Sequence, residues 1–409
     1  MTHYVRHLDY LMLATALSIS AFGLWIMQSA TKNYAGNLYG HQLLYVAVGT
    51  VGMLSVAAIP PALMRRVRWP LYAFVLLSTA AVLVVGTSIG GGRRWINLGA
   101  FQFQPSEFAK LLLIVGLAAV LASRRGVTGP ARLTLLAICY VGLPALLVFK
   151  EPDFGTMLVF LAIMLGMLFV YGIPWQHFVW MILAVCVIGA LIFSVLPGMG
   201  VQVVQEYQIT RLTSFLHPNP NDVQSGGFQL RQSVIAVSHG GLGGTNNDAS
   251  VPGQQLGATQ TSLGFLPEAP TDFVFAVVGE ERGFVGAAWL ICLYALLLWR
   301  GLKVITKSRS TFGSLVAAGV VSMLLFQIFI NIGMTIGLAP VTGIPLPFMS
   351  FGGSHTITNL LAIGVLQAIH VHAQAADEPA FAVEQEGQGA EVRRAGVGAD
   401  GPEGAARDR

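Results

Sequence analysis

The chain has 409 residues, of which 54% are hydrophobic and only 10% carry a charged side chain. Soluble globular domains carry about 25% charged residues, so this composition excludes an ordinary soluble protein and indicates a polytopic membrane protein. The net charge of +4 is compatible with contacts to anionic membrane lipids. No basic segment alternates with aromatic residues in a soluble module, so a nucleic-acid partner is not predicted.

Ten apolar stretches have about the length that crosses a bilayer as a helix. A membrane β-barrel would instead show short alternating strands, so the predicted fold class is an all-α polytopic membrane protein with about ten transmembrane helices. We expect these helices at residues 9–29, 41–60, 70–88, 107–123, 132–149, 154–171, 177–197, 273–299, 312–339 and 351–373, forming one membrane domain over residues 1–373.

Basic residues near the ends of the spans predict the orientation, because Lys and Arg favour the cytoplasmic side. The strongly basic connections are the second, the fourth and the eighth, with Arg65, Arg66 and Arg68, then Arg124 and Arg125, then Arg300, Lys303, Lys307 and Arg309. All three are even-numbered. With ten spans, this pattern places both termini in the cytoplasm and the odd-numbered connections outside the cytoplasmic membrane.

Two segments differ from the spans in composition. Residues 198–272 form a large extracytoplasmic loop between helices 7 and 8, and a connection of that length is usually functional or disordered. Inside it, residues 227–237 have the pattern of a short amphipathic helix on the membrane surface. Residues 374–409 are rich in Ala, Gly, Glu, Gln and Arg with one aromatic residue, which predicts a disordered cytoplasmic tail.

The acidic residues indicate which side carries the chemistry. The chain has 19 Asp and Glu residues, and eight of them lie in the tail. Apart from Asp9, all the others fall in or beside segments that the topology places at the outer face. The sequence therefore predicts an extracytoplasmic active site.

Charged residues near membrane depth are costly, so each is a functional candidate. Glu107 and Lys110 lie at i and i+3 on one helical face, where the alternative is a structural ion pair. Arg94 lies in an outer connection, although basic residues favour the cytoplasmic side. The alternative to a functional role is that Arg94 anchors the chain to lipid headgroups. Asp153 and Asp272 each precede a span, where each could instead be a helix N-cap.

Further into the eighth span lie Glu280, Glu281 and Arg282. Three ionisable groups at that depth predict a water-filled cavity, with Arg282 neutralising one glutamate. The three cysteines lack metal spacing and the histidines do not share a helical face, so no metal site, disulfide or zinc is predicted. No serine has a recognisable base and orienting acid, so a serine hydrolase is not predicted.

Several motif blocks recur together along residues 8–373. They are Arg94-Trp95 with 104–110 (QPSEFAK), 151–156 (EPDFGT), Tyr207-Gln208 with Arg211, 257–281 around 265–268 (FLPE), and 345–354 (PLPFMSFGGS). In this order they resemble the SEDS family (shape, elongation, division and sporulation), the RodA and FtsW proteins of bacterial cell-wall synthesis. The run 343–347 (GIPLP) is more similar to the elongation branch, RodA, than to the division branch, FtsW.

The resemblance implies a peptidoglycan glycosyltransferase that polymerises lipid II, the undecaprenyl-pyrophosphate-linked disaccharide-pentapeptide, with a class B penicillin-binding protein as partner. Asp272 matches the acidic residue proposed as catalytic base in the family's large outer loop. The other candidate substrate-binding residues that match its motifs are Arg94, Glu107, Lys110, Asp153, Arg211, Glu268, Ser350 and Ser354. A divalent cation, Mg²⁺ or Mn²⁺, could assist, but the sequence does not assign its ligands.

The chain departs from the family pattern at four positions. Pro270 replaces a common His, Glu151 a common Gln, Phe351 a common Tyr, and His355 a common Ser. We expect these changes to alter the fine positioning of the site more than its activity.

Three alternatives stay open from the sequence. A lipid II flippase would use the same charged cavity but needs gating on both sides and charges near the bilayer midplane. A division-type, FtsW-like member would share the chemistry. A catalytically silent scaffold for the penicillin-binding protein would tolerate changes to the cavity charges.

Overall fold

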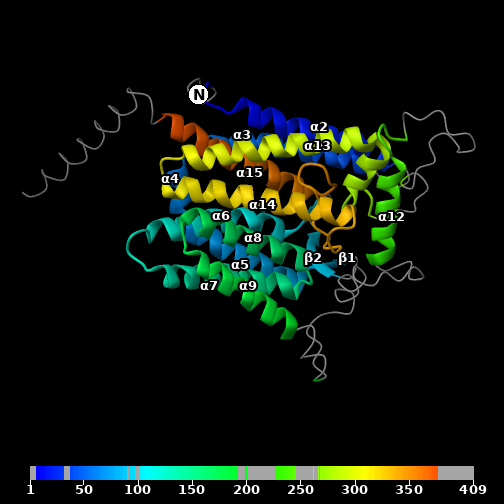
Figure 1. The fold of residues 1–409 in the computed structure, drawn as a ribbon. Helices are drawn as coiled ribbons and strands as arrows, with labels where there is room; N and C mark the ends of the chain where they lie inside the picture. The colour runs from blue at the N-terminus through cyan, green and yellow to red at the C-terminus, as the bar shows by residue number, and fades with distance from the viewer. Residues whose placement is uncertain are drawn as a thin grey trace, which may run out of the picture.

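The structure is a computed structural model that describes residues 6–31, 37–89, 92–97, 99, 101–191, 199, 226–245, 261, 266 and 268–375. Its architecture is a bundle of long helices with one short helix lying across an end, as Figure 1 shows. The predicted tail, residues 374–409, falls outside the described residues except for its first two positions. Most of the predicted outer loop, residues 198–272, lies outside them as well.

Within the described residues, nine helices are long and apolar enough to cross a membrane. They are α2 (Tyr10–Ala30), α3 (Leu38–Ala57), α5 (Arg68–Val85), α6 (Pro105–Ser123), α7 (Pro130–Lys150), α8 (Phe154–Tyr171), α13 (Val274–Lys307), α14 (Thr311–Thr335) and α15 (Gly353–Ala375). The remaining predicted span, the seventh (177–197), corresponds to the shorter apolar helix α9 (Trp175–Ala190). The predicted all-α membrane fold is confirmed, and the shorter elements are α4 (Pro61–Arg66) and α12 (Gly226–His239).

Burial separates inner helices from outer ones. In α6 and α15, 78% of the apolar window is buried inside the protein, against 17% in α5. The inner helices therefore face protein on most sides. The outer ones expose large apolar side chains such as Leu77, Val84 and Trp180, as a lipid-facing surface requires.

The eighth span differs from its prediction in length. Helix α13 continues to Lys307, so Arg300, Lys303 and Lys307 lie on its last turns rather than in the connection that follows. Basic side chains are favourable at a helix C-terminus, which explains why the helix extends past the apolar run. Two guanidinium nitrogens of Arg300 bond Asp9 Oδ2, at 2.8 and 2.5 Å, and join this end of α13 to the start of α2.

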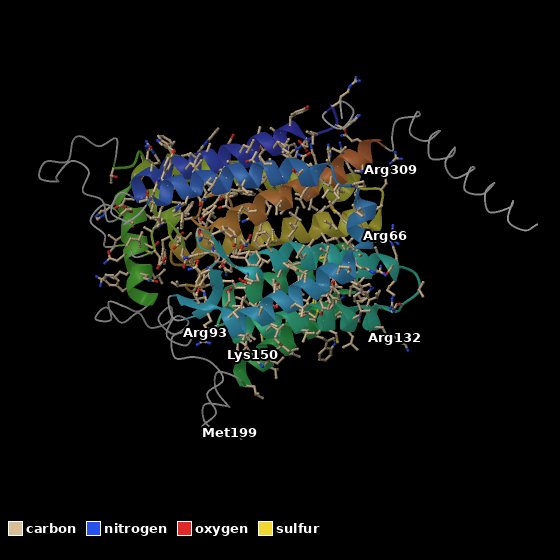
Figure 2. The ribbon with its side chains drawn as sticks, turned by 180° about the vertical axis from the view of Figure 1, so that it is seen from behind. Arg66, Arg93, Arg132, Lys150, Met199 and Arg309 are labelled. Atoms are coloured by element: carbon tan, nitrogen blue, oxygen red, sulfur yellow. The ribbon has the colours of Figure 1, made fainter. Side chains whose placement is uncertain are left out.

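The odd-numbered connections gather at one end of the bundle. In Figure 2, Arg66, Arg132 and Arg309 mark one end, whereas Arg93 and Lys150 lie toward the other. Helix α12 lies at that second end and runs across the bundle, packed on α13 and α14 (Figure 1). This orientation suits the amphipathic surface helix predicted for residues 227–237.

A small antiparallel sheet fills the third connection, at the same end, and the sequence analysis did not predict it. It consists of β1 (Thr87–Ile89), β2 (Gly92–Asn97) and β3 (Gln102–Phe103), in the order β1-β2-β3. Trp95 pairs with Thr87, and Ile96 pairs with Phe103. The sheet holds Arg94 beside the start of α6 at a fixed depth.

Helix α13 is broken at Gly283, whose φ of 61° and ψ of −161° are not helical. The freed backbone groups bond the turn after α12, with Phe284 N donating to Gly241 O at 2.8 Å and Thr245 N to Glu280 O at 2.9 Å. A Cβ on Gly283 would lie 2.5 Å from the backbone nitrogen of Gly244. Only glycine satisfies both the positive φ and the close approach.

Replacing Gly283 with alanine should therefore destabilise the protein. The left-handed backbone alone costs about 1–3 kcal/mol, and the contact with the turn adds to it. We expect Gly283→Ala to lower the thermal unfolding midpoint of the purified protein. The matched control is Gly142→Ala, because Gly142 lies in α7 with open space around it and should gain up to about 1 kcal/mol. Equal midpoints for the two variants would contradict the constraint.

Candidate functional site

A cavity of about 720 Å³ opens at the end of the bundle where the odd-numbered connections meet. Its walls come from segments far apart in the sequence, including α3, the small sheet, α6, α8, α12 and the turns before α13 and α15. The lining residues are His41, Tyr45, Arg94, Trp95, Gly99, Gln102, Gln104, Glu107, Lys110, Asp153, Thr156, Val159, Gln229, Glu268, Thr271, Asp272, 343–345 and 351–355. This volume lies in the range of small-molecule sites.

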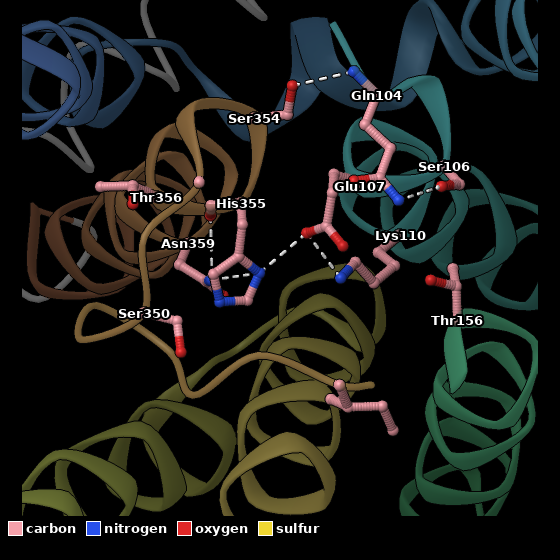
Figure 3. A network of polar contacts seen from close by, with 12 residues as sticks. Gln104, Ser106, Glu107, Lys110, Thr156, Ser350, Ser354, His355, Thr356 and Asn359 are labelled. Carbon is pink, nitrogen blue, oxygen red and sulfur yellow. Dashed lines mark hydrogen bonds and ion pairs between the residues drawn. The ribbon is translucent and has the colours of Figure 1, made fainter. Parts of the chain in front are cut away.

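At the base of the cavity, Glu107 lies between two nitrogen groups, as Figure 3 shows. Lys110 Nζ is 2.7 Å from Glu107 Oε2, and His355 Nδ1 is 2.9 Å from the same oxygen. All three side chains are buried, with 2 to 4% exposure. The predicted pair on one helical face is present, and it extends to a histidine on α15.

Asn359 holds His355 within α15. Its Nδ2 donates to His355 O at 2.9 Å and lies 3.1 Å from Nε2 and 3.3 Å from Nδ1 of the same ring. Because His355 Nδ1 is also 2.9 Å from Glu107 Oε2, the carboxylate joins α15 to α6.

Asp153 has both of the functions that the sequence left open. It is the N-cap of α8, with Oδ1 accepting from Thr156 N at 3.1 Å and Oδ2 from Thr156 Oγ1 at 2.8 Å. Gln104 Nε2 also reaches Oδ2, at 3.4 Å. Capping and lining the cavity are compatible, because the cap fixes the carboxylate at the cavity wall.

Arg94 is held by the backbone of the connection between α7 and α8. Its Nε donates to Glu151 O at 3.3 Å, and its Nη2 donates to Pro152 O. Both acceptors are neutral carbonyl groups. Within the described residues no carboxylate forms an ion pair with Arg94, so its positive charge is available to an anion in the cavity.

Asp272 lies in a tight turn that begins at Glu268, a residue with φ of 57°. Glu268 O accepts from the backbone nitrogens of Thr271, Asp272 and Phe273 at 3.1 to 3.3 Å. Asn331 Nδ2 donates to Asp272 O at 2.8 Å and to Ile344 O at the same distance. The N-cap residue of α13 is Phe273, the residue that follows Asp272.

The structure brings most of the predicted site residues together. Arg94, Glu107, Lys110, Asp153, Glu268, Asp272 and Ser354 all line the cavity. Ser350 is fully buried, and its Oγ accepts from Leu346 N at 2.8 Å, so it shapes the turn and is not among the lining residues. Arg211 lies outside the described residues.

The charged group inside α13 is separate from this cavity. Glu280 Oε2 accepts from Thr261 Oγ1 at 2.7 Å, and Glu281 Oε1 accepts from Ser29 Oγ at 2.5 Å. The guanidinium of Arg282 lies 3.7 Å from the ring centroid of Trp25. None of the three α13 residues lines the cavity, so the water-filled cavity predicted from them is not the one that the structure shows.

Sequence reasoning missed several lining residues. His355 was noted only as a departure from the family pattern, and its partner Glu107 is 248 residues away. Phe351 was likewise noted only as a departure, and Tyr45 was not singled out; both line the cavity, with ring centroids 6.3 Å apart, as an aromatic wall. The apolar sequence around Tyr45 gives no signal that separates it from a lipid-facing aromatic residue.

The buried pair of Glu107 and Lys110 predicts an asymmetric response to mutation. Removing one partner leaves an uncompensated buried charge and should cost about 3–5 kcal/mol. We expect Glu107→Gln or Lys110→Met to lower the thermal unfolding midpoint strongly, and the double variant to recover part of the loss. Glu268→Gln, at an exposed position, is the control for charge removal and should change the midpoint little. Additive losses in the double variant would exclude the pair.

Comparisons with known proteins identify the relatives of this chain. A family model described as "Cell cycle protein", which joins FtsW, RodA and SpoVE, matches residues 7–375. The peptidoglycan glycosyltransferase MrdB of Escherichia coli (strain K12) is 34% identical over 367 residues, which cover 90% of this chain and 94% of that protein.

Solved structures give the same result. One is a chain of a peptidoglycan synthase complex, solved to show the structural coordination of polymerization and crosslinking. It is 28% identical to this chain with a TM-score of 0.73, and the match covers 90% of this chain and 98% of that chain. The crystal structure of the Thermus thermophilus rod shape determining protein RodA is 28% identical with a TM-score of 0.63, covering 89% and 96%. Sequence and fold therefore agree that this chain belongs to the SEDS family of FtsW, RodA and SpoVE proteins.

Proposed function

We propose that this protein polymerises lipid II into peptidoglycan glycan strands at the outer face of the cytoplasmic membrane, during cell elongation. The enzyme class, a peptidoglycan glycosyltransferase, follows from a relative of that name that is 34% identical over 90% of the chain. The single observation that carries the proposal for this chain is the cavity itself, which is lined by a carboxylate, a cation held by neutral carbonyls and an aromatic wall.

The reaction needs one base and one site for negative charge. A hydroxyl oxygen of the acceptor sugar forms a bond to the anomeric carbon of the donor, and the bond from that carbon to the pyrophosphate breaks. Undecaprenyl pyrophosphate leaves with the bonding electrons, and the hydroxyl proton passes to the base. A single displacement inverts the α-linked donor to a β-linked product, so one positioned carboxylate suffices.

Asp272 is the candidate base. It lines the cavity, and its backbone is fixed from two sides by the Glu268 turn and by Asn331. Glu107 is a poorer base, because it is neutralised by Lys110 at 2.7 Å. Asp153 is also poorer, because its two oxygens accept the hydrogen bonds of the α8 cap.

Arg94 is the candidate group for the pyrophosphate. A guanidinium presents paired donors that match phosphate oxygens, and Arg94 keeps a charge that no described carboxylate neutralises. Lys110 was expected to share this role from the sequence. Its ion pair with Glu107 favours a structural part in shaping the cavity base instead. Arg211 stays a further candidate from the sequence alone.

The aromatic wall suits a saccharide. Tyr45 and Phe351 line the cavity, and Tyr45 also packs edge-on against Phe101 with centroids 5.8 Å apart. Sugar rings present an apolar C–H face that packs on aromatic rings while their hydroxyl groups bond polar neighbours. Gln102 and Gln104 provide such neighbours beside the wall.

A divalent cation at this site would take ligands from the substrate as well as from the protein. Mg²⁺ prefers several oxygen ligands. Among the described residues no three His, Cys, Asp or Glu side chains are close enough to hold a metal ion. The lining carboxylates could bind Mg²⁺ or Mn²⁺ only together with substrate phosphates, so no step of the reaction is assigned to a cation.

A class B penicillin-binding protein is the proposed partner, and lipid II and membrane lipids the other binding molecules. The complex among the structural relatives couples polymerization to crosslinking, which supports a crosslinking partner for this chain. A flippase needs openings on two sides, whereas this cavity gathers its charges at one end of the bundle, which favours the polymerase.

Replacing the candidate base should abolish polymerisation without unfolding the protein. Asp272→Asn keeps the shape and removes the proton acceptor, so the rate of glycan-strand formation from purified lipid II should fall about 10²–10⁴-fold. Asp272→Glu, which retains a carboxylate, should keep part of the activity. The unfolding midpoint serves as the control and should stay within a degree or two. Polymerisation by Asp272→Asn at the wild-type rate would exclude the assignment.

The proposed orientation predicts which ends of the bundle are accessible from outside the cell. In a background lacking Cys139, Cys186 and Cys292, Arg93→Cys should react with a membrane-impermeant maleimide added to intact cells. Arg309→Cys, at the opposite end (Figure 2), should react only after the membrane is permeabilised. The reverse pattern would place the cavity in the cytoplasm and exclude extracytoplasmic polymerisation.

A further inference from the structure

Glu151 is a buried acid without a partner. It follows the last residue of α7, in the connection to α8, and its side chain has no solvent exposure. Within the described part of the chain, neither carboxyl oxygen has a hydrogen-bond donor. An ionised carboxylate in that position would lose its hydration without gaining a hydrogen bond from the protein.

The surroundings of Glu151 favour its protonated form. Burial, and then the neighbouring charge of Asp153, raise the pKa of the Glu151 carboxyl to about 8, although Arg94 acts in the opposite direction. Among the described residues, these are the two charged groups that act on it, one from the start of α8 and one from β2. Lys150, the preceding residue, is exposed.

The backbone of Glu151 binds Arg94, one of the residues that line the cavity. The carbonyls of Glu151 and Pro152 accept from the guanidinium of Arg94, which lines the cavity. Pro152 has φ of 27°, an unusual backbone conformation. The Glu151 side chain is not among the residues that line the cavity, although Arg94 is close enough to act on the charge of its carboxyl.

We propose that Glu151 is a positioning residue that acts as a neutral acid near Arg94, leaving the guanidinium charge to the pyrophosphate of the lipid-linked substrate. This inference rests on the proposed function. When Glu151 loses its proton, the new carboxylate neutralises Arg94 and weakens its hold on phosphate oxygens. In its neutral state Glu151 has the shape and charge of the glutamine that is common at this position in the family.

The proposal predicts a pH dependence that one substitution removes. Glu151→Gln keeps the neutral shape at every pH. Wild type and variant should polymerise lipid II equally at pH 7. From pH 8 to pH 9 the kcat/KM of wild type should fall about fivefold relative to the variant, mainly through KM, because the neutral fraction of Glu151 falls by that factor. Parallel pH profiles would overturn the proposal.

A binding measurement separates this inference from the polymerase assignment. The affinity of the reconstituted protein for undecaprenyl pyrophosphate should weaken about fivefold between pH 8 and pH 9 in wild type relative to Glu151→Gln. If neither protein polymerises lipid II but this difference is present, the proposed function fails and the role of Glu151 stands. Equal binding by the two proteins at both pH values would overturn the role of Glu151 whatever the activity.

Two further readouts report the proton directly. The infrared spectrum of wild type at pH 7 should contain the C=O stretching band of a buried carboxylic acid that disappears above pH 8 and is absent from Glu151→Gln. The folded protein also keeps a proton that the unfolded chain loses above its pKa of 4.5, so wild-type stability should fall, relative to the variant, as pH rises from about 5 to 8. The absence of both signals would show that Glu151 is ionised, contrary to the proposal.

Discussion

The buried pair of Glu107 and Lys110 is the interaction on which the geometry of the site depends. Two opposite charges lie on one face of α6, a helix buried over most of its length, where neither would be stable alone. Because Glu107 also bonds His355, the pair fixes the distance between α6 and α15. Glu107, Lys110 and His355 all line the cavity, so this contact fixes part of its wall.

The other walls of the cavity receive their shape from helix ends rather than from helix interiors. Asp153 caps α8, the Glu268 turn begins α13, and Ser354 Oγ joins the first turn of α15 to Gln102 O at 3.1 Å. Backbone groups at helix ends need partners, and polar side chains that provide them can also face a substrate. The same residues therefore stabilise the bundle and line the cavity.

Much of the fold could be predicted from the sequence, because a bilayer imposes a length and a composition on each span. The starts of α6, α7 and α13 lie within two residues of the predicted edges. The three short strands could not be predicted, since a few residues of glycine-rich connection carry no periodic pattern. The extension of α13 to Lys307 was missed for a related reason, because hydropathy marks the apolar run and not the helix.

The site was predictable where its chemistry is local and not where it depends on packing. Glu107 and Lys110 share a helical face by their spacing alone, and Asp153 precedes a span as a cap does. The contact of His355 with Glu107 and the contact of Arg94 with the Glu151 backbone require the folded bundle. Neither contact has a signal in a single sequence.

Two of the positions where this chain departs from its family lie beside charged residues. His355 replaces a common serine and contacts Glu107 at 2.9 Å. Glu151 replaces a common glutamine, and its burial favours the neutral acid. While it is protonated, Glu151 therefore adds an ionisable group near Arg94 without adding a charge. The positive charge on which a phosphate-binding site depends is preserved.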